Sequence, residues 1–116
     1  MTPEAKAMLA ATPGGILLRE FLDPMGISQA EFARRTGMPA SRITEIIKGR
    51  RTITAESALA FGIFFNMEPQ FWLNLQSHYD LRCAQLEKET ELRQRIDPLP
   101  ASAVAEEPSQ YNNEAS

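Results

Sequence analysis

The segment from Ser28 to Thr54 constrains the fold most, because it contains two short helical patterns separated by a single glycine. Ser28 begins the first pattern, and Glu31 stands three residues later, as in a capping box. Gly37 closes that helix, since glycine readily adopts the left-handed conformation of a tight turn. Pro39 starts the second helix. Two helices joined in this way, the second with polar residues outward, predict a helix-turn-helix.

The apolar residues of this segment have the spacing that packs two crossing helices together. We expect the small Ala33 at the crossing point, and Ile43 and Ile46, one turn apart, as the anchors of the second helix. A plain helical hairpin needs similar residues, so packing alone leaves both structures open. The predicted packing set is Phe32, Ala33, Gly37, Met38, Ile43 and Ile46.

Positive charge is concentrated in the same segment of an otherwise acidic chain. Between Ser28 and Arg51 there are six bases and two acids, a net charge of +4. The whole chain carries −3, so the remaining residues, with six bases and thirteen acids, carry −7. This asymmetry predicts a local site for a polyanion. A solvated helix face is the alternative explanation of the same charges.

Two more helices flank this segment. The first begins with Thr12 as its N-cap and Pro13 in its first turn, and we expect Pro24 and Gly26 to end it. The other begins after the motif, with Thr54 as its N-cap. Both helices carry apolar residues at helical spacing, which predicts that they pack on the same core.

The longest helical pattern runs from Pro69 to about Ile96. Its apolar residues recur at intervals of three and four, close to a coiled-coil seam. We assign this seam to dimerisation, with packing in the core as the alternative. Its members are Trp72, Leu75, Tyr79, Cys83 and Leu86.

The chain therefore divides into four predicted parts. Residues 1–12 form a flexible N-terminal segment, and residues 13–67 form the core, with the helix-turn-helix at about 28–49. Residues 68–96 form the long helix, which we expect to dimerise. Residues 97–116 contain three prolines, four acids and no base, which is typical of a disordered acidic tail.

Several classes of function are disfavoured by what the sequence lacks. A single cysteine, Cys83, allows no internal disulfide framework. The lone His78 has no second ligand at metal-binding spacing, so we expect neither a metal nor a cofactor. There is no glycine-rich phosphate loop or acid–base constellation, which argues against an enzyme. No apolar run approaches the roughly 20 residues of a membrane helix, and we expect a cytoplasmic protein without membrane contact.

Longer phrases of the sequence carry a family resemblance. The run from Ser28 to Gly49 resembles the helix-turn-helix of the Cro/C1-type (XRE) family. From Thr12 to Leu81 the chain is similar to the HigA-type antitoxins, the addiction-module antidote family. Thr12 stands where these proteins usually have histidine, and Gly15 where they usually have glutamate. The phrases that carry the resemblance are Pro13-Gly14, Leu18 to Leu22, Ile43 to Gly49, Ile53-Thr54-Ala55 and Phe71 to Gln76.

The resemblance implies a fold and a mechanism. The fold would be all-α, a five-helix Cro/C1-type (lambda-repressor-like) domain with a long C-terminal helix. A homodimer would bind double-stranded operator DNA in its own promoter, and a two-fold dimer implies an inverted repeat. The protein would also neutralise a small, basic, RelE/HigB-like toxin that cleaves mRNA. A stand-alone XRE-type regulator without a toxin is the alternative.

Candidate DNA contacts follow from the outward positions of the motif. Ser41, Arg42 and Glu45 can read base edges, and Arg42 can equally hold a phosphate. Ser28 can hold a phosphate at a helix N-terminus or act only as a cap, and Gln29 is chosen by analogy with the family. The predicted base contacts are Ala40, Ser41, Arg42, Thr44 and Glu45. The predicted phosphate contacts are Ser28, Gln29, Lys48, Arg50 and Arg51.

Overall fold

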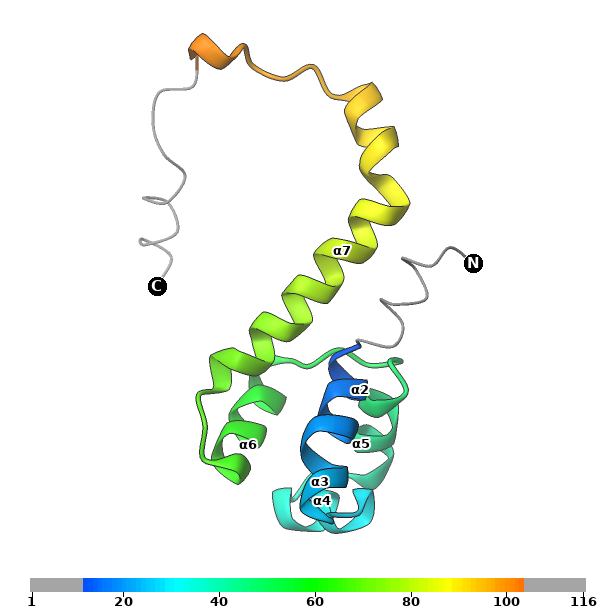
Figure 1. The fold of residues 1–116 in the computed structure, drawn as a ribbon, viewed down its shortest axis with the longest axis vertical. Coiled ribbons are helices and arrows are strands. Elements are labelled where there is room, and N and C mark those ends of the chain that lie inside the picture. The colour runs from blue at the N-terminus through cyan, green and yellow to red at the C-terminus, as the bar shows by residue number, and fades with distance from the viewer. Residues whose placement is uncertain (1–11, 104–116) are drawn as a thin grey trace.

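The computed structural model describes residues 12–103, which form helices and connecting segments without a strand (Figure 1). The predicted all-α fold with five helices is confirmed over this range, whereas the expectations for residues 1–11 and 104–116 lie outside it. The first helix is continuous through three parts, which are α2 (Pro13–Ile16), the π-helical η1 (Leu17–Leu22) and α3 (Asp23–Met25). The other helices are α4 (Gln29–Thr36), α5 (Ala40–Ile47), α6 (Ala55–Phe65) and α7 (Pro69–Arg95). A 3₁₀ turn, η2 (Ala101–Ala103), follows α7.

Hydroxyl caps set where three of these helices begin. Thr12, Ser28 and Thr54 each accept a hydrogen bond from the backbone amide three residues ahead, at 3.0, 3.0 and 3.2 Å. Each bond satisfies a donor that the first turn of a helix leaves unpaired. The Glu31 carboxylate, which the capping box directs back to Ser28, bonds the Arg35 guanidinium at 3.3 Å. The predicted starts of these helices therefore correspond to the caps in the structure.

The first helix ends at Gly26 as predicted, but it runs through Pro24, which was also expected to end it. Proline has no N–H to donate, and its ring crowds the carbonyl four residues earlier. The wider π turn of η1 lies just upstream, with the Asp23 amide bonded to the Leu18 carbonyl. Such a turn gives the ring room and lets the helix continue. Gly26, in the left-handed conformation at φ 69°, ends it.

The core is built on large side chains from every helix. Trp72 of α7 is completely buried, and its ring centroid lies 4.8 Å from that of Phe21 and 5.3 Å from that of Phe61. Its indole N–H has no hydrogen-bond partner in the described part of the chain, so Trp72 stabilises the core by packing. The other fully buried large residues are Leu17, Leu22, Phe32, Ile43, Ile46 and Phe61.

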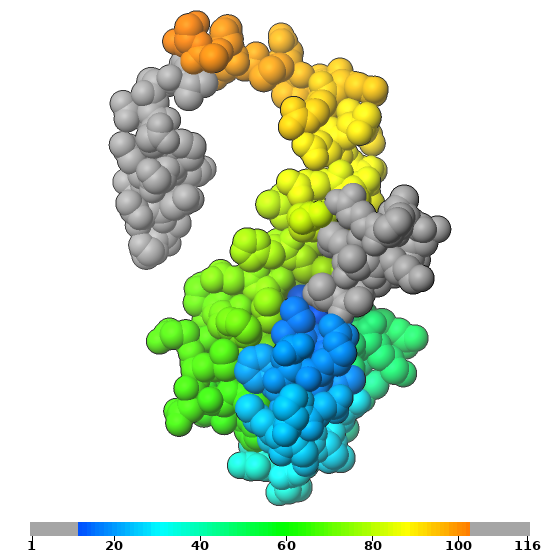
Figure 2. Space-filling model, viewed as in Figure 1, coloured from blue at the N-terminus to red at the C-terminus, as the bar shows by residue number. Residues whose placement is uncertain are grey.

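Helix α7 extends far beyond this core. Its first turns pack against α6, and its C-terminal half stands away from the other helices (Figures 1 and 2). From its middle onward, α7 exposes the apolar residues Leu81 and Leu86. The helix ends at Arg95, one residue before the predicted limit at Ile96.

Gly14 lies where the first helix and α5 approach most closely. A Cβ atom at this position would lie 1.9 Å from the Ile46 carbonyl oxygen and 2.7 Å from the Ile47 Cα. Both are backbone atoms, so no side-chain rotation could relieve the overlap. The absence of a side chain at Gly14 therefore sets how α5 is seated on the rest of the protein.

Candidate nucleic-acid interface

Helix α5 turns one face to the core and the opposite face to solvent. Ile43 and Ile46 are buried, and the helix packs on both α4 and α2. Ala40 and Ser41, at its N-terminal end, are exposed. An exposed N-terminal half of the second motif helix is the part that enters a major groove in helix-turn-helix proteins. The structure thus leaves the N-terminal end of α5 accessible to a large ligand such as a DNA groove.

The other base-reading candidates are half-buried at the edges of the same face. Arg42, Thr44 and Glu45 each expose part of the side chain. The Thr44 hydroxyl donates a hydrogen bond to Gln29 Oε1 at 3.4 Å. This weak bond joins α5 to the first residue of α4, and no pattern in the sequence indicates it. The bond places one predicted base contact, Thr44, beside one predicted phosphate contact, Gln29.

The N-terminus of α4 combines a cap with donors that are available to an anion. The Ser28 hydroxyl accepts from the Glu31 amide, as a cap does, and keeps its own proton as a donor. Gln29 accepts the Thr44 bond through Oε1, while its Nε2 retains two donor hydrogens. Both residues can therefore donate to a phosphate without giving up their contacts in the protein.

Three cations lie in the segment that follows α5. Lys48, Arg50 and Arg51 are all exposed. Gly49 adopts the left-handed conformation at φ 80°, and the Arg50 amide donates to the Glu45 carbonyl at 2.9 Å. The turn thereby places three exposed positive side chains directly after α5, where they are available to a polyanion.

Arg35 contributes differently, because its guanidinium is engaged within the protein. It pairs with Glu31 at 3.3 Å and lies 4.8 Å from the centroid of the Phe64 ring. Such a cation–π contact stabilises α4 on α6. The contact with Phe64, which lies on another helix, depends on the tertiary fold. Arg35 is therefore a structural residue of the motif.

Sequence reasoning missed two residues that shape this interface. Gly14 allows α5 to approach the first helix, and Gln76 of α7 accepts a hydrogen bond from the Ile53 amide at 2.8 Å. Both belong to phrases that carry the family resemblance, Pro13-Gly14 and Phe71 to Gln76. Their roles depend on contacts with segments more than 20 residues away, which periodicity does not reveal.

The acids of the long helix are largely balanced by neighbouring bases. Glu89 pairs with Arg93 at 2.8 Å, and Glu91 pairs with Lys88 at 3.7 Å. Between Leu81 and Arg95 the sequence has four bases and three acids. This part of α7 therefore does not carry the acidic surplus of the chain, which lies in other segments.

The predicted seam of α7 divides between the core and the surface. Trp72 is buried within the chain's own core, so a second chain could reach only the later seam residues. Leu75, Tyr79 and Cys83 are half-buried, and Leu86 is 42% exposed. Dimerisation along these four residues stays a prediction.

Tyr79 lies at the middle of this seam. Burial, the Cys83 side chain, and the charges of Asp80 and Glu87 raise the pKa of the Tyr79 phenol. The shift is away from neutral pH, so the phenol remains protonated and uncharged under physiological conditions. An uncharged Tyr79 is compatible with packing against a second chain.

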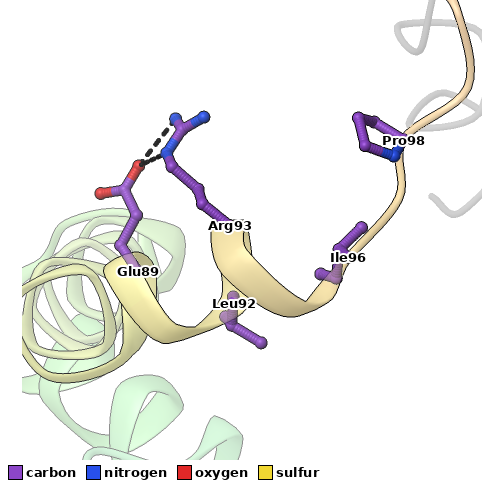
Figure 3. A pocket seen from close by; sticks show the side chains of 5 residues that line it. All are labelled: Glu89, Leu92, Arg93, Ile96 and Pro98. Carbon is purple, nitrogen blue, oxygen red and sulfur yellow. Dashed lines mark hydrogen bonds and ion pairs between the residues drawn. The ribbon is translucent and has the colours of Figure 1, made fainter.

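The described residues contain no group of metal ligands, and a surface hollow lies at the far end of α7. Between residues 12 and 103 no three His, Cys, Asp or Glu side chains gather as metal ligands. A hollow of about 290 Å³ at the end of α7 is lined by Leu92, Ile96, Pro98 and the Glu89–Arg93 ion pair (Figure 3). It lies at the opposite end of α7 from the core. Over the same range no helix has the length and apolar character needed to cross a bilayer.

Comparison with known proteins gives consistent similarities. Residues 18–72 match the helix-turn-helix family HTH_3. Virulence-associated protein I of Dichelobacter nodosus is 42% identical over 83 residues, which are 72% of this chain and 77% of that protein. The Pseudomonas aeruginosa antitoxin HigA, solved with the higBA promoter, superposes with a TM-score of 0.73 at 38% identity, covering 76% of this chain and 96% of that one. A HigA-family addiction module antidote protein from Coxiella burnetii superposes with a TM-score of 0.72 at 35% identity, covering 76% of this chain and 96% of that one.

Proposed function

The chain belongs to the helix-turn-helix family and, within it, to the HigA-type antitoxins, and from this premise we propose that it is an antitoxin that represses its own promoter. The family is one of DNA-binding proteins and not of enzymes. The observation that carries the proposal is the exposed N-terminal half of α5, followed directly by the exposed cations Lys48, Arg50 and Arg51. A related HigA of the same fold is described with its promoter DNA.

In the proposed complex, α5 lies in the major groove. Ser41, Arg42 and Glu45 read base edges, with Ala40 and Thr44 beside them. Ser28, Gln29 and the three cations hold the phosphates that flank the groove. The phosphate contacts supply affinity and orientation, and the base contacts supply sequence preference. Binding to the promoter of its own gene implies that the protein acts in the cytoplasm.

We propose a homodimer as the form that binds DNA. One module of this size makes few base contacts, and a two-fold pair doubles them on an inverted repeat. The part of the seam formed by Leu75, Tyr79, Cys83 and Leu86 supports pairing along α7, because it is apolar and only partly covered by the chain itself.

The second part of the proposal is neutralisation of a basic, RelE/HigB-like toxin. It rests on the family and on the charge of the chain outside the motif, −7. Because bases offset the acids of α7 between Leu81 and Arg95, attraction would come mainly from exposed acids elsewhere, among them Glu20, Asp23, Glu56 and Glu68. Charge of this kind steers the encounter, and buried apolar contacts supply most of the affinity. Leu17 and Leu22 are buried in the core and cannot serve as such contacts.

The proposal predicts that DNA binding and toxin neutralisation use separate surfaces. A variant with alanine at Ser41, Arg42, Lys48 and Arg50 should still rescue cells that express the toxin, yet fail to repress the promoter. The toxin would be the product of an adjacent gene for a basic, RelE-like protein. A chain that ends after Ile96 should rescue growth and repress equally well, and serves as the control for the tail.

Growth rescue and a promoter reporter measure the two activities in the same cells. Loss of rescue by a folded alanine variant would contradict separate surfaces. Loss of rescue by the shortened chain would place the tail in the toxin interface. If no adjacent toxin gene exists and the promoter is still repressed, the protein is the stand-alone regulator of the alternative.

A further inference from the structure

Gln76 connects the long helix to the segment that carries the exposed cations. The Ile53 amide donates to Gln76 Oε1 at 2.8 Å, and Gln76 Nε2 donates to Asp80 Oδ1 at 2.9 Å. Ile53 precedes α6, and Gln76 and Asp80 lie one turn apart on α7. One side-chain amide thus bridges a backbone donor in the segment between α5 and α6 and a carboxylate on α7.

The chemistry of the three partners permits only one orientation of that amide. A backbone N–H can only donate, and an ionised carboxylate can only accept. The Gln76 amide has one acceptor side and one donor side, so its oxygen must face Ile53 while its nitrogen faces Asp80. Asp80 therefore fixes Gln76 in the orientation that holds the Ile53 amide.

This contact anchors one end of the cationic segment. At the α5 end, the Arg50 amide is bonded to the Glu45 carbonyl at 2.9 Å. At the α6 end, the Ile53 side chain is 3% exposed and its amide is bonded to Gln76. Arg50 and Arg51 lie between these two anchors and are exposed. Arg51 also lines a cavity of about 140 Å³ that Gln76 and Asp80 help to form.

Building on the proposed DNA-binding function, we infer that Gln76 is a positioning residue for DNA. It holds the segment from Lys48 to Ile53 in the conformation in which Arg50 and Arg51 meet the phosphates. Without this contact, the segment samples other conformations. The affinity for DNA then falls in proportion to the fraction of molecules that still adopt the binding conformation. Phosphates carry no sequence information, so operator and unrelated DNA lose affinity equally.

Replacement of Gln76 by leucine tests the inference, because leucine keeps the volume and removes both hydrogen bonds. The affinity for operator and for unrelated duplex DNA should fall by the same factor, about threefold to tenfold, as for the loss of one hydrogen bond. Gln70→Leu is the matched control. Gln70 also bonds a residue one turn ahead on α7, Asn74 at 3.1 Å, but has no bond to the cationic segment. Its affinity for DNA should equal that of the wild type.

An exchange of donor and acceptor tests the bridge itself. In the double variant Gln76→Glu with Asp80→Asn, the new carboxylate accepts from the Ile53 amide and from the new side-chain amide one turn ahead, and the net charge is unchanged. Gln76→Glu alone places two carboxylates together and should bind DNA weakly, whereas the double variant should regain wild-type affinity. Failure of Asp80→Asn to restore binding would overturn the inference, even if Gln76→Leu proves too unstable to measure.

A third measurement separates positioning from a general effect on the fold. In a chain with alanine at Lys48, Arg50 and Arg51, Gln76→Leu should cause no further loss, because the groups that it positions are gone. An equal loss in that chain and in the wild type would show that Gln76 acts through the whole fold, and would overturn the inference. If Gln76→Leu bound DNA as tightly as the wild type does, the inference about Gln76 would be overturned and the proposed function would stand. Failure of the wild type to bind DNA at low salt would overturn both.

Discussion

Gly14→Ala is expected to lower the free energy of unfolding by about 3 kcal/mol or more and Tm by more than about 10 °C. In an ordinary helix the same change stabilises by about 1 kcal/mol, because alanine is the better helix former. Here the added Cβ would lie 1.9 Å from the Ile46 carbonyl oxygen, so the first helix and α5 must separate. Thermal and denaturant unfolding, followed by circular dichroism, measure the change.

Gly62→Ala provides the matched comparison for this prediction. Its Cβ would lie 2.8 Å from the Met67 carbonyl oxygen, in the turn between α6 and α7, and 3.0 Å from Cγ of Pro69, the first residue of α7. A turn can shift by a few tenths of an ångström, so we expect a smaller loss of about 1–2 kcal/mol. If Gly14→Ala were as stable as the wild type, α5 would not be seated on the first helix as described.

The second large effect is expected from Lys48, Arg50 and Arg51 together. Replacement of all three by alanine removes six phosphate contacts from the proposed dimer and should weaken binding to every DNA sequence by roughly five orders of magnitude at about 0.1 M salt. Each phosphate contact contributes about 0.9 to the slope of log K against log salt, so six lost contacts lower its magnitude by about 5.4. Fluorescence anisotropy with a labelled duplex at several salt concentrations measures both quantities.

A second triple variant controls for charge alone. Lys88, Arg93 and Arg95 are exposed on the distal half of α7, and their replacement by alanine removes the same total charge. Two of them form exposed ion pairs, which contribute little to stability. This variant should keep nearly the full affinity and salt slope. Equal losses in the two variants would mean that net charge, and not the turn after α5, governs binding to DNA.

Local sequence signals were sufficient to predict where the helices begin. Thr12, Ser28 and Thr54 are hydroxyl residues before apolar periodic segments, and each caps its helix in the structure. These interactions span three residues, so the sequence contains all of their information. Pro24 was misleading, because the usual effect of proline on a helix is avoided by a π turn that no local signal announces.

Contacts between distant segments were less accessible to sequence reasoning. The spacing of the α7 seam was correct for a helix, but it did not distinguish the buried Trp72 from the exposed Leu86. That distinction depends on where α7 leaves the core. Likewise, Gln76 is an ordinary polar residue in the sequence, and only the fold brings it to the Ile53 amide. The residues on the outward face of α5 could be selected because the helical period and the buried Ile43 and Ile46 define that face.

Selection of binding sites from randomised duplex DNA tests the central claim most directly. The wild-type chain should select an inverted repeat, with half-site centres about 34 Å apart or a multiple of that distance. A variant with alanine at Ser41, Arg42 and Glu45 should prefer different bases at the contacted positions, each good contact being worth about 1–3 kcal/mol. Selection of the same sequences by both proteins would contradict the assignment of α5 as the reading helix, and selection of an isolated half-site would contradict the dimer.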